Sequence, residues 1–176
     1  RSECYPAVLQ TLLGDGCRVR NFGYSGATAG RVTNEPYWET PSFTSATRFV
    51  PQVCVLGFGS NDAQHVNLAN LPRFRDDYTA LVEHFRSLGD RVAVVLTQPL
   101  PVFEPLPEID AATLDTVIRP TIDDIGRSLA IPVVDSFTPF RDRGDWFPDN
   151  LHPTAAGARL LAELVADTLR AERLAG

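Results

Sequence analysis

The chain has 176 residues and a formal net charge of −6, and 44% of its residues are hydrophobic. This length fits one domain, residues 1–176, and the apolar fraction is enough to bury a sizeable core. The negative charge argues against a nucleic-acid partner or an anionic membrane surface, because both call for a basic patch. No apolar stretch approaches the roughly 18 to 20 residues that a membrane-spanning helix needs.

The first residues and the cysteines bear on the compartment and on metal binding. Residues 1–4 lead directly into a helical pattern and show no signal peptide, so cytoplasm and exterior both stay open. Cys4, Cys17 and Cys54 lack metal-type spacing, and an odd number fits no simple disulfide framework. Cys54 lies in an apolar run and is interpreted as a buried structural thiol. With only three histidines in the chain, the sequence gives little support for a metal site, and no cofactor is expected.

The first half of the chain predicts one helix, two strands and a long loop. Residues 5–13 carry apolar side chains at helical spacing. Residues 18–22 are expected to form a short strand, followed by a glycine-rich turn at 23–30. The segment 31–49 is interpreted as an irregular surface loop with aromatic anchors. Residues 53–57 form the continuous apolar run that is typical of a strand buried on both faces.

The second half predicts helices that alternate with strands: helices at 71–88, 109–129 and 154–173, and strands at 91–97 and 131–135. The prolines of loop 99–107 set a defined path for the backbone, and Pro120 should kink or break the helix around it. Alternation of helices with apolar strands predicts a parallel, three-layer α/β sheet. In such sheets the functional site is built at the carboxyl ends of the strands.

A carboxylate and an imidazole lie three residues apart near the C-terminus, at Asp149 and His152. Pro153 disfavours helical dihedrals at His152 and suits the first position of the last helix. Both side chains are therefore expected on the loop that enters this helix, able to face one cleft. The pair suits a general base and the group that orients it. The alternative is a solvated acid beside a helix-capping histidine, because short motifs often arise by chance.

Two further segments, 23–30 and 57–62, also follow predicted strands. Gly26 could be a simple turn glycine, and Asn61-Asp62 could form a cap or an Asx-turn. That all three segments follow strands raises the functional interpretation above these alternatives.

Together these segments resemble the SGNH (GDSL-type) hydrolases, and the resemblance spans essentially the whole chain. Residues 21–28 are similar to the family's second block, residues 59–62 to its third block (G-x-N-D), and residues 149–152 to its fifth block. The resemblance implies an α/β/α sandwich with a mostly parallel, flavodoxin-like sheet. It also implies a serine esterase that needs no metal or organic cofactor.

The site residues follow from these matches. The backbone N–H of Gly26 and the side-chain amide of Asn61 would donate hydrogen bonds to an oxyanion, and His152 would be the general base that Asp149 orients. Gly59 and Asp62 would support the site, Asp62 by accepting hydrogen bonds from the backbone.

Three other side chains are candidates for the substrate rim. Residues 36–43 resemble a segment of family members that act as carbohydrate or sialate O-acetylesterases. Tyr37 and Trp38 could stack there on a sugar, or they could anchor the loop. His65 is interpreted as a rim or solvent residue, and His84 as a partly buried surface histidine.

The family's nucleophile, in a G-D-S motif after a first, central strand, does not occur in this sequence. Ser2 has no preceding Gly-Asp and follows no strand, and Ser25 and Ser60 lie inside the oxyanion blocks. We therefore expect that the chain is truncated at its N-terminus, that its first central strand is missing, and that the chain as printed has little or no activity.

Two functions remain open. The complete protein would be a serine esterase that removes small acyl groups, such as O-acetyl, from carbohydrates or other small-molecule esters. Alternatively, the chain is a degenerate homologue that binds an acylated sugar or a partner without hydrolysing it. The oligomeric state is not predicted.

Overall fold

The computed structural model describes residues 4–104 and 106–175, so the prediction for Ser2 lies outside the described residues. The chain divides into two compact units, and each is described by itself. The first consists of residues 1–21, 100–106 and 134–176, and the second of residues 22–99 and 107–133.

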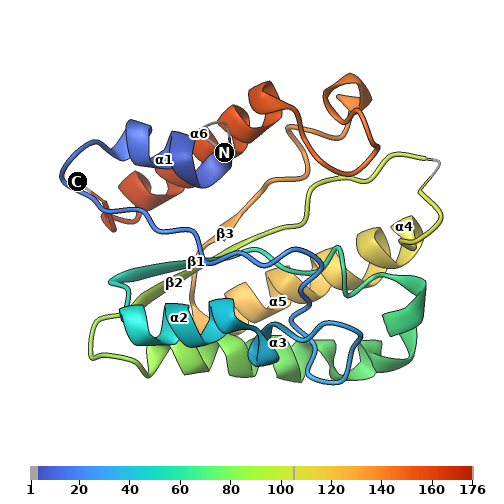
Figure 1. Ribbon diagram of the computed structural model, residues 1–176, viewed down its shortest axis with the longest axis horizontal. Coiled ribbons are helices and arrows are strands. Elements are labelled where there is room, and N and C mark those ends of the chain that lie inside the picture. The colour runs from blue at the N-terminus through green and yellow to red at the C-terminus, as the bar shows by residue number, and fades with distance from the viewer. Residues whose placement is uncertain (1–3, 105, 176) are drawn as a thin grey trace. The chain divides into compact units, whose positions relative to one another are not determined.

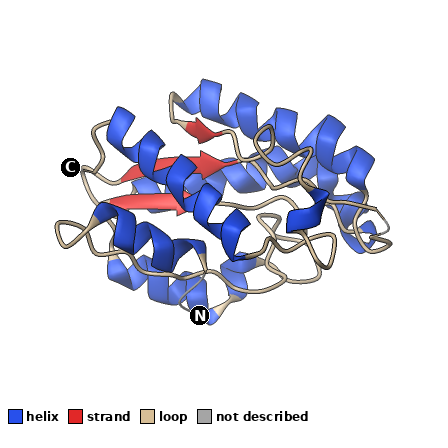
Figure 2. Ribbon diagram, turned by 90° about the horizontal axis from the view of Figure 1, so that it is seen from above, coloured by secondary structure: helices blue, strands red, loops and turns tan. Residues whose placement is uncertain are grey.

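The second unit contains two parallel strands, and a third strand ends at Val134, the residue at which the chain returns to the first unit. β1 (Val53–Leu56) pairs in parallel with β2 (Ala93–Thr97), and the strand order is β1-β2-β3, with β3 at Val133–Val134. Figure 2 shows β1 and β2 side by side. The three strands predicted at 53–57, 91–97 and 131–135 are confirmed, each somewhat shorter than expected.

The second unit also contains these helical segments: η1 (Tyr37–Glu39), α2 (Pro41–Phe49), η2 (His65–Asn70), α3 (Leu71–Arg86), α4 (Ala111–Thr113), η3 (Leu114–Ile118) and α5 (Arg119–Leu129). Helix α3, predicted at 71–88, contacts both β2 and α5. Its buried face includes Tyr78, Leu81 and Phe85, all at most 1% exposed. Helix α2 lies beside α3 (Figure 1), where Phe43 meets Phe85 edge to face.

The first unit holds the two terminal helices, α1 (Tyr5–Leu13) and α6 (Ala155–Ala171), with the short η4 (Gly144–Trp146) before α6. Figure 1 shows α1 and α6 running along each other, and the side chain of Arg170 donates a hydrogen bond to the carbonyl of Leu12 at 2.8 Å. Both helices were predicted from their apolar spacing and are confirmed. In the described ranges no helix is long and apolar enough to cross a membrane.

Two predictions are wrong. Residues 18–22 form no strand in the described part of the chain. The side chain of Gln10 binds backbone groups at this segment that a neighbouring strand would otherwise bind. Its Oε1 accepts the backbone N–H of Val19 at 2.8 Å, and its Nε2 donates to the carbonyl of Cys17 at 2.9 Å. The loop predicted at 31–49 is helical from residue 41 onward.

Local chemistry explains helix α2 and the break near Pro120. Thr40 caps α2 by accepting the backbone N–H of Phe43 at 3.1 Å, and Pro41 occupies the first turn, where no N–H is needed. The helix predicted at 109–129 contains a π-helical stretch, η3, directly before Pro120. Because proline has no N–H to continue the regular pattern, the predicted disturbance of the helix is confirmed.

Candidate active site

Asp149 and His152 of the first unit form a hydrogen-bonded pair. His152 Nδ1 lies 2.8 Å from Asp149 Oδ2, and the other carboxylate oxygen accepts the backbone N–H groups of His152 at 2.6 Å and Leu151 at 3.1 Å. These hydrogen bonds, first those from the backbone and side chain of His152, lower the pKa of Asp149 to about 2. The carboxylate is thus ionised at neutral pH and is held in place by three hydrogen bonds, two from backbone N–H groups and one from the His152 ring. Both side chains are exposed, at 56% and 74%.

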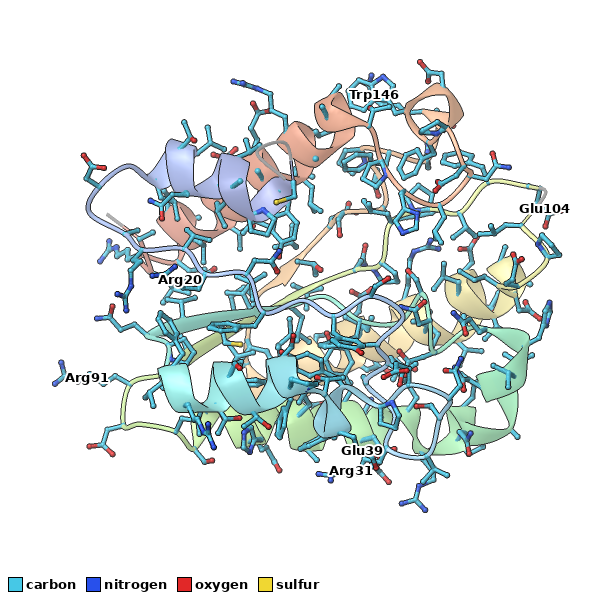
Figure 3. All side chains as sticks on the ribbon, in the orientation of Figure 1. Arg20, Arg31, Glu39, Arg91, Glu104 and Trp146 are labelled. Carbon is cyan, nitrogen blue, oxygen red and sulfur yellow. The ribbon has the colours of Figure 1, made fainter. Side chains whose placement is uncertain are left out.

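The turn that carries this pair is fixed on both sides. Asn150 adopts a positive φ of 65°, which asparagine tolerates better than most residues, and its carbonyl accepts the N–H of Phe103 at 2.9 Å. On the other side, the N–H of Thr154 donates to the carbonyl of Trp146 at 2.8 Å. Trp146, labelled in Figure 3, packs edge to face on Phe140. The backbone of the turn is therefore held from two directions.

Helix α6 starts at Ala155, one residue later than predicted, and Pro153 is not its first residue. Thr154 is the residue that caps the helix, since its Oγ1 accepts the N–H of Gly157, and Pro153 lies just before it, outside the helix. His152 consequently belongs to the preceding turn and is not the helix cap.

In the second unit, Asp62 binds the loop that contains Gly26. Asp62 is 3% exposed, and its two oxygens accept the backbone N–H groups of Ala29 at 3.1 Å and Gly30 at 2.9 Å. Burial raises the pKa of Asp62 to about 6, although the backbone N–H groups oppose this shift. The expected contact of Asp62 with the backbone is thus present.

Asn61 forms a further link between the same two segments. Its Nδ2 donates to the carbonyl of Ala27 at 3.1 Å, and its Oδ1 accepts a hydrogen bond from Gln64 Nε2 at 3.0 Å. Gly26, next to Ala27, has a φ of 80°, a conformation that glycine adopts at little cost. The structure therefore brings together the loop of Gly26 with Asn61 and Asp62.

Gly59 occupies a position that only glycine suits. Its φ is 124°, and a Cβ there would lie 2.6 Å from Ile118 Cγ2. The backbone before Asn61 can follow its path because this residue has no side chain.

The aromatic candidates for the substrate rim are both held by the protein. Tyr37 is 4% exposed and its hydroxyl donates to the carbonyl of Phe22 at 3.0 Å. Trp38 is half-buried, its Nε1 donates to the carbonyl of Ala29 at 3.0 Å, and the guanidinium of Arg31 (labelled in Figure 3) lies 3.5 Å from its ring centroid. These contacts favour the anchoring alternative, most clearly for Tyr37.

The other candidate side chains lie as follows. His65 begins η2 and is exposed. His84 is half-buried, with Nε2 2.9 Å from Thr47 Oγ1, and burial together with the charge of Arg31 lowers its pKa. Burial raises the pKa of the Cys54 thiol to about 12, which keeps it protonated and unreactive at neutral pH.

Sequence reasoning missed three polar residues linked to Asn61: Gln64 and Asn67 bond to Asn61 directly, and Asn34 bonds to both of them. Asn67 is 1% exposed and Gln64 is half-buried. Asn34 lies 33 positions before Asn67 along the chain. The only signal in the sequence is the number of amide side chains within a few residues of Asn61, which by itself does not distinguish a network from a polar loop.

Comparison with known proteins identifies the family and the fold. The sequence profile of the GDSL-like Lipase/Acylhydrolase family matches residues 1–160. An acetylxylan esterase from Xylanibacter ruminicola is 28% identical over 184 residues, covering 94% of this chain and 38% of that protein. The chain thus spans less than half the length of the curated relatives it matches.

Two solved structures illustrate the fold. An aryl esterase from M. smegmatis superposes with a TM-score of 0.77 at 16% identity, covering 97% of this chain and 86% of that one. A carbohydrate acetylesterase family member from Sinorhizobium meliloti gives 0.70 at 17% identity, covering 96% and 86%. These matches confirm the predicted three-layer α/β/α fold, and the profile match shows that the chain belongs to the GDSL-like lipase/acylhydrolase family.

Proposed function

We propose that the protein containing this chain is a serine ester hydrolase that removes small acyl groups, such as O-acetyl, from carbohydrates. The observation that carries the proposal is the His152–Asp149 pair, with 2.8 Å between Nδ1 and Oδ2 and a carboxylate anchored on two backbone N–H groups. Membership of the family supports the reaction type. The names of an acetylxylan esterase and a carbohydrate acetylesterase among the relatives support the substrate class.

The pair has the polarity that a general base needs. Because Asp149 is ionised, it can only accept, so the neutral imidazole of His152 carries its proton on Nδ1. The lone pair on Nε2 is then available to take the proton of a serine hydroxyl and to return it to the leaving alcohol. The exposure of His152 gives a substrate access to this nitrogen.

The oxyanion donors in the proposal are the backbone N–H of Gly26 and the side chain of Asn61. Acyl transfer from a serine ester builds negative charge on the former carbonyl oxygen, and fixed donors aimed at that oxygen stabilise the transition state. An asparagine amide has two N–H groups, and one of those on Asn61 already binds Ala27. The second N–H is the one assigned to the oxyanion.

The nucleophilic serine is assigned to a segment outside the printed sequence, because the sequence contains no G-D-S motif. The same observation favours the rival function, a homologue that binds an acylated carbohydrate without turnover. Ligands of either protein would be small-molecule or carbohydrate esters, and the net charge of −6 disfavours nucleic acid.

Hydrolysis of p-nitrophenyl acetate by the protein, prepared with the segment that precedes Arg1, tests the proposal. We expect turnover, and His152→Ala should lower kcat by roughly three to six powers of ten, as loss of a triad base does in serine proteases. Arg91→Ala, which removes an exposed side chain just before β2, is the control and should leave kcat within about threefold, as expected for a residue with no role in the chemical step. A folded protein that carries G-D-S and binds acetylated sugars without turnover would establish the rival.

A further inference from the structure

Four amide side chains form a continuous chain of hydrogen bonds that ends beside Gly26. Asn67 Nδ2 donates to Asn34 Oδ1 at 2.8 Å, Asn34 Nδ2 donates to Gln64 Oε1 at 3.0 Å, and Gln64 Nε2 donates to Asn61 Oδ1 at 3.0 Å. Asn61 Nδ2 then donates to the carbonyl of Ala27 at 3.1 Å. Each amide in the chain accepts from one neighbour and donates to the next.

Backbone groups fix the direction of this chain. Asn67 Oδ1 accepts the backbone N–H of Asn34 at 3.0 Å, and Asn67 Nδ2 also donates to the backbone carbonyl of Asn61 at 2.9 Å. Because a backbone N–H can only donate and a carbonyl can only accept, the buried amide of Asn67 has one possible orientation. The carbonyl of Ala27 imposes the same direction at the far end.

The direction matters most at Asn61. A rotation of its amide by 180° would place Nδ2 against the donor Gln64 Nε2 and Oδ1 against the carbonyl of Ala27. Donor would then face donor and acceptor would face acceptor. The network therefore keeps the N–H groups of Asn61 on the side of the Gly26 loop.

We propose that Gln64, supported by Asn34 and Asn67, is a positioning residue that aims the Asn61 amide at the oxyanion. The inference rests on the proposed function, in which Asn61 stabilises the transition state. Gln64 touches neither substrate nor reacting atoms in this proposal, and it acts only through Asn61. Since the oxyanion forms in the transition state, loss of this aim lowers kcat and leaves KM almost unchanged.

A double-mutant cycle tests whether Gln64 affects kcat through Asn61. Complete loss of an oxyanion donor costs about 10²–10³ in kcat, so Asn61→Ala sets this ceiling and Gln64→Leu should lower kcat by about 10- to 100-fold. In the Asn61→Ala background Gln64→Leu should change kcat by less than about twofold, because no amide remains to be aimed. An equal loss in both backgrounds, or a Gln64→Leu variant within about threefold of the wild type in kcat, overturns the proposal. Gln52→Leu, an exposed glutamine just before β1, is the matched control and should leave kcat unchanged.

The pH dependence of kcat in Gln64→Glu separates the aiming role from a general loss of structure. A protonated glutamic acid can accept from Asn34 and donate its O–H to Asn61, as Gln64 does, whereas the ionised form can only accept. The kcat of this variant relative to the wild type should therefore recover as the pH falls toward about 4.3, the ordinary glutamate pKa. A ratio that does not change with pH contradicts the aiming role.

The two proposals can fail separately. In the ¹⁵N–¹H spectrum, the side-chain NH₂ signals of Asn61 should be well dispersed in the wild type and should move toward the positions of a solvated asparagine in Gln64→Leu. If these signals keep their shifts in Gln64→Leu, the positioning role is overturned, even in an active enzyme. If they move but Asn61→Ala retains full kcat, the oxyanion assignment fails and the proposed role of Gln64 fails with it, although the amide contact itself is real.

Discussion

Replacement of Asp62 by asparagine should change how the stability of the protein depends on pH. The pKa of Asp62 is raised from its usual 3.8 to about 6 by burial, so the native state binds this proton more tightly than the unfolded state does. The contribution to stability is complete below pH 3.8 and is lost as the pH rises through 6. Between pH 3.5 and pH 7 this loss amounts to roughly 2–3 kcal/mol, at about 1.4 kcal/mol for each unit of pKa shift.

Asparagine has no such proton, and its own effect does not depend on pH. It replaces one acceptor oxygen by an NH₂ group, which leaves the N–H of Ala29 or Gly30 facing a donor, at a cost of about 1–3 kcal/mol. Asp62→Asn should therefore be less stable than the wild type at pH 3.5, and the gap should close by roughly 2–3 kcal/mol at pH 7.

Urea unfolding of both proteins at the two pH values measures this difference. Asp76→Asn, which removes a carboxylate from the exposed side of α3, controls for the change in net charge. A gap that stays constant, or widens at pH 7, would refute the reasoning. It would mean that the backbone N–H groups stabilise the ionised carboxylate more than burial disfavours it.

Three further outcomes are expected. Asp149→Asn should lower kcat by about 10⁴ by disturbing the tautomer of His152, and a folded Asp149→Asn enzyme whose kcat stays within about tenfold of the wild type would contradict the assignment. Gly59→Ala should destabilise the protein by about 2 kcal/mol or more in urea unfolding, because of its positive φ and the contact with Ile118. Gly16→Ala, where a Cβ meets nothing within 4 Å, is its control, and equal losses in the two variants would argue against strain. Thr40→Ala should cost about 1–2 kcal/mol in urea unfolding by removing the cap of α2. Thr40→Ser keeps the hydroxyl and should cost less, about 0.8 kcal/mol for the buried methyl group, and a loss as large as in the alanine variant would show that the hydroxyl is not the stabilising group.

Apolar periodicity was enough to predict the elements whose burial is set by their own sequence. The apolar residues of α1, α3 and α6 lie on one face of each helix, as in a helix buried on one side. Those of β1 and β2 form an unbroken run, as in a strand buried on both faces. The segment 18–22 has a similar local pattern, but a strand also needs a neighbour with which to pair. Local sequence contains no information about that neighbour, or about the side chain of Gln10 that binds the backbone there.

Helix α2 was missed although its start signal is present. Thr40-Pro41 has the chemistry of a cap followed by a first helical position. The segment was interpreted as a loop because aromatic residues and prolines surround this signal. The cap was the better guide, because it acts directly on the first turn of the helix.

Of the candidate site, the contact between Asp149 and His152 could be predicted from the sequence, whereas the partners of its more distant residues could not. Asp149 and His152 lie close in sequence, so their contact needs only a tight turn. The hydrogen bonds that join Asp62 to Ala29 and Gly30 span more than 30 positions, and so does the pairing of Asn34 with Asn67. Contacts at this separation depend on how the whole unit folds, and no local pattern encodes them.

The most direct test of the central claim is labelling of the protein, prepared with the segment that precedes Arg1, by a fluorophosphonate, which a serine attacks with loss of fluoride only when a base activates it. The account predicts a single adduct on the serine of a G-D-S motif before Arg1. In His152→Ala, labelling should be slower by several powers of ten, as expected from loss of the triad base. An adduct on Ser25 or Ser60, or labelling at the same rate in His152→Ala, would contradict it.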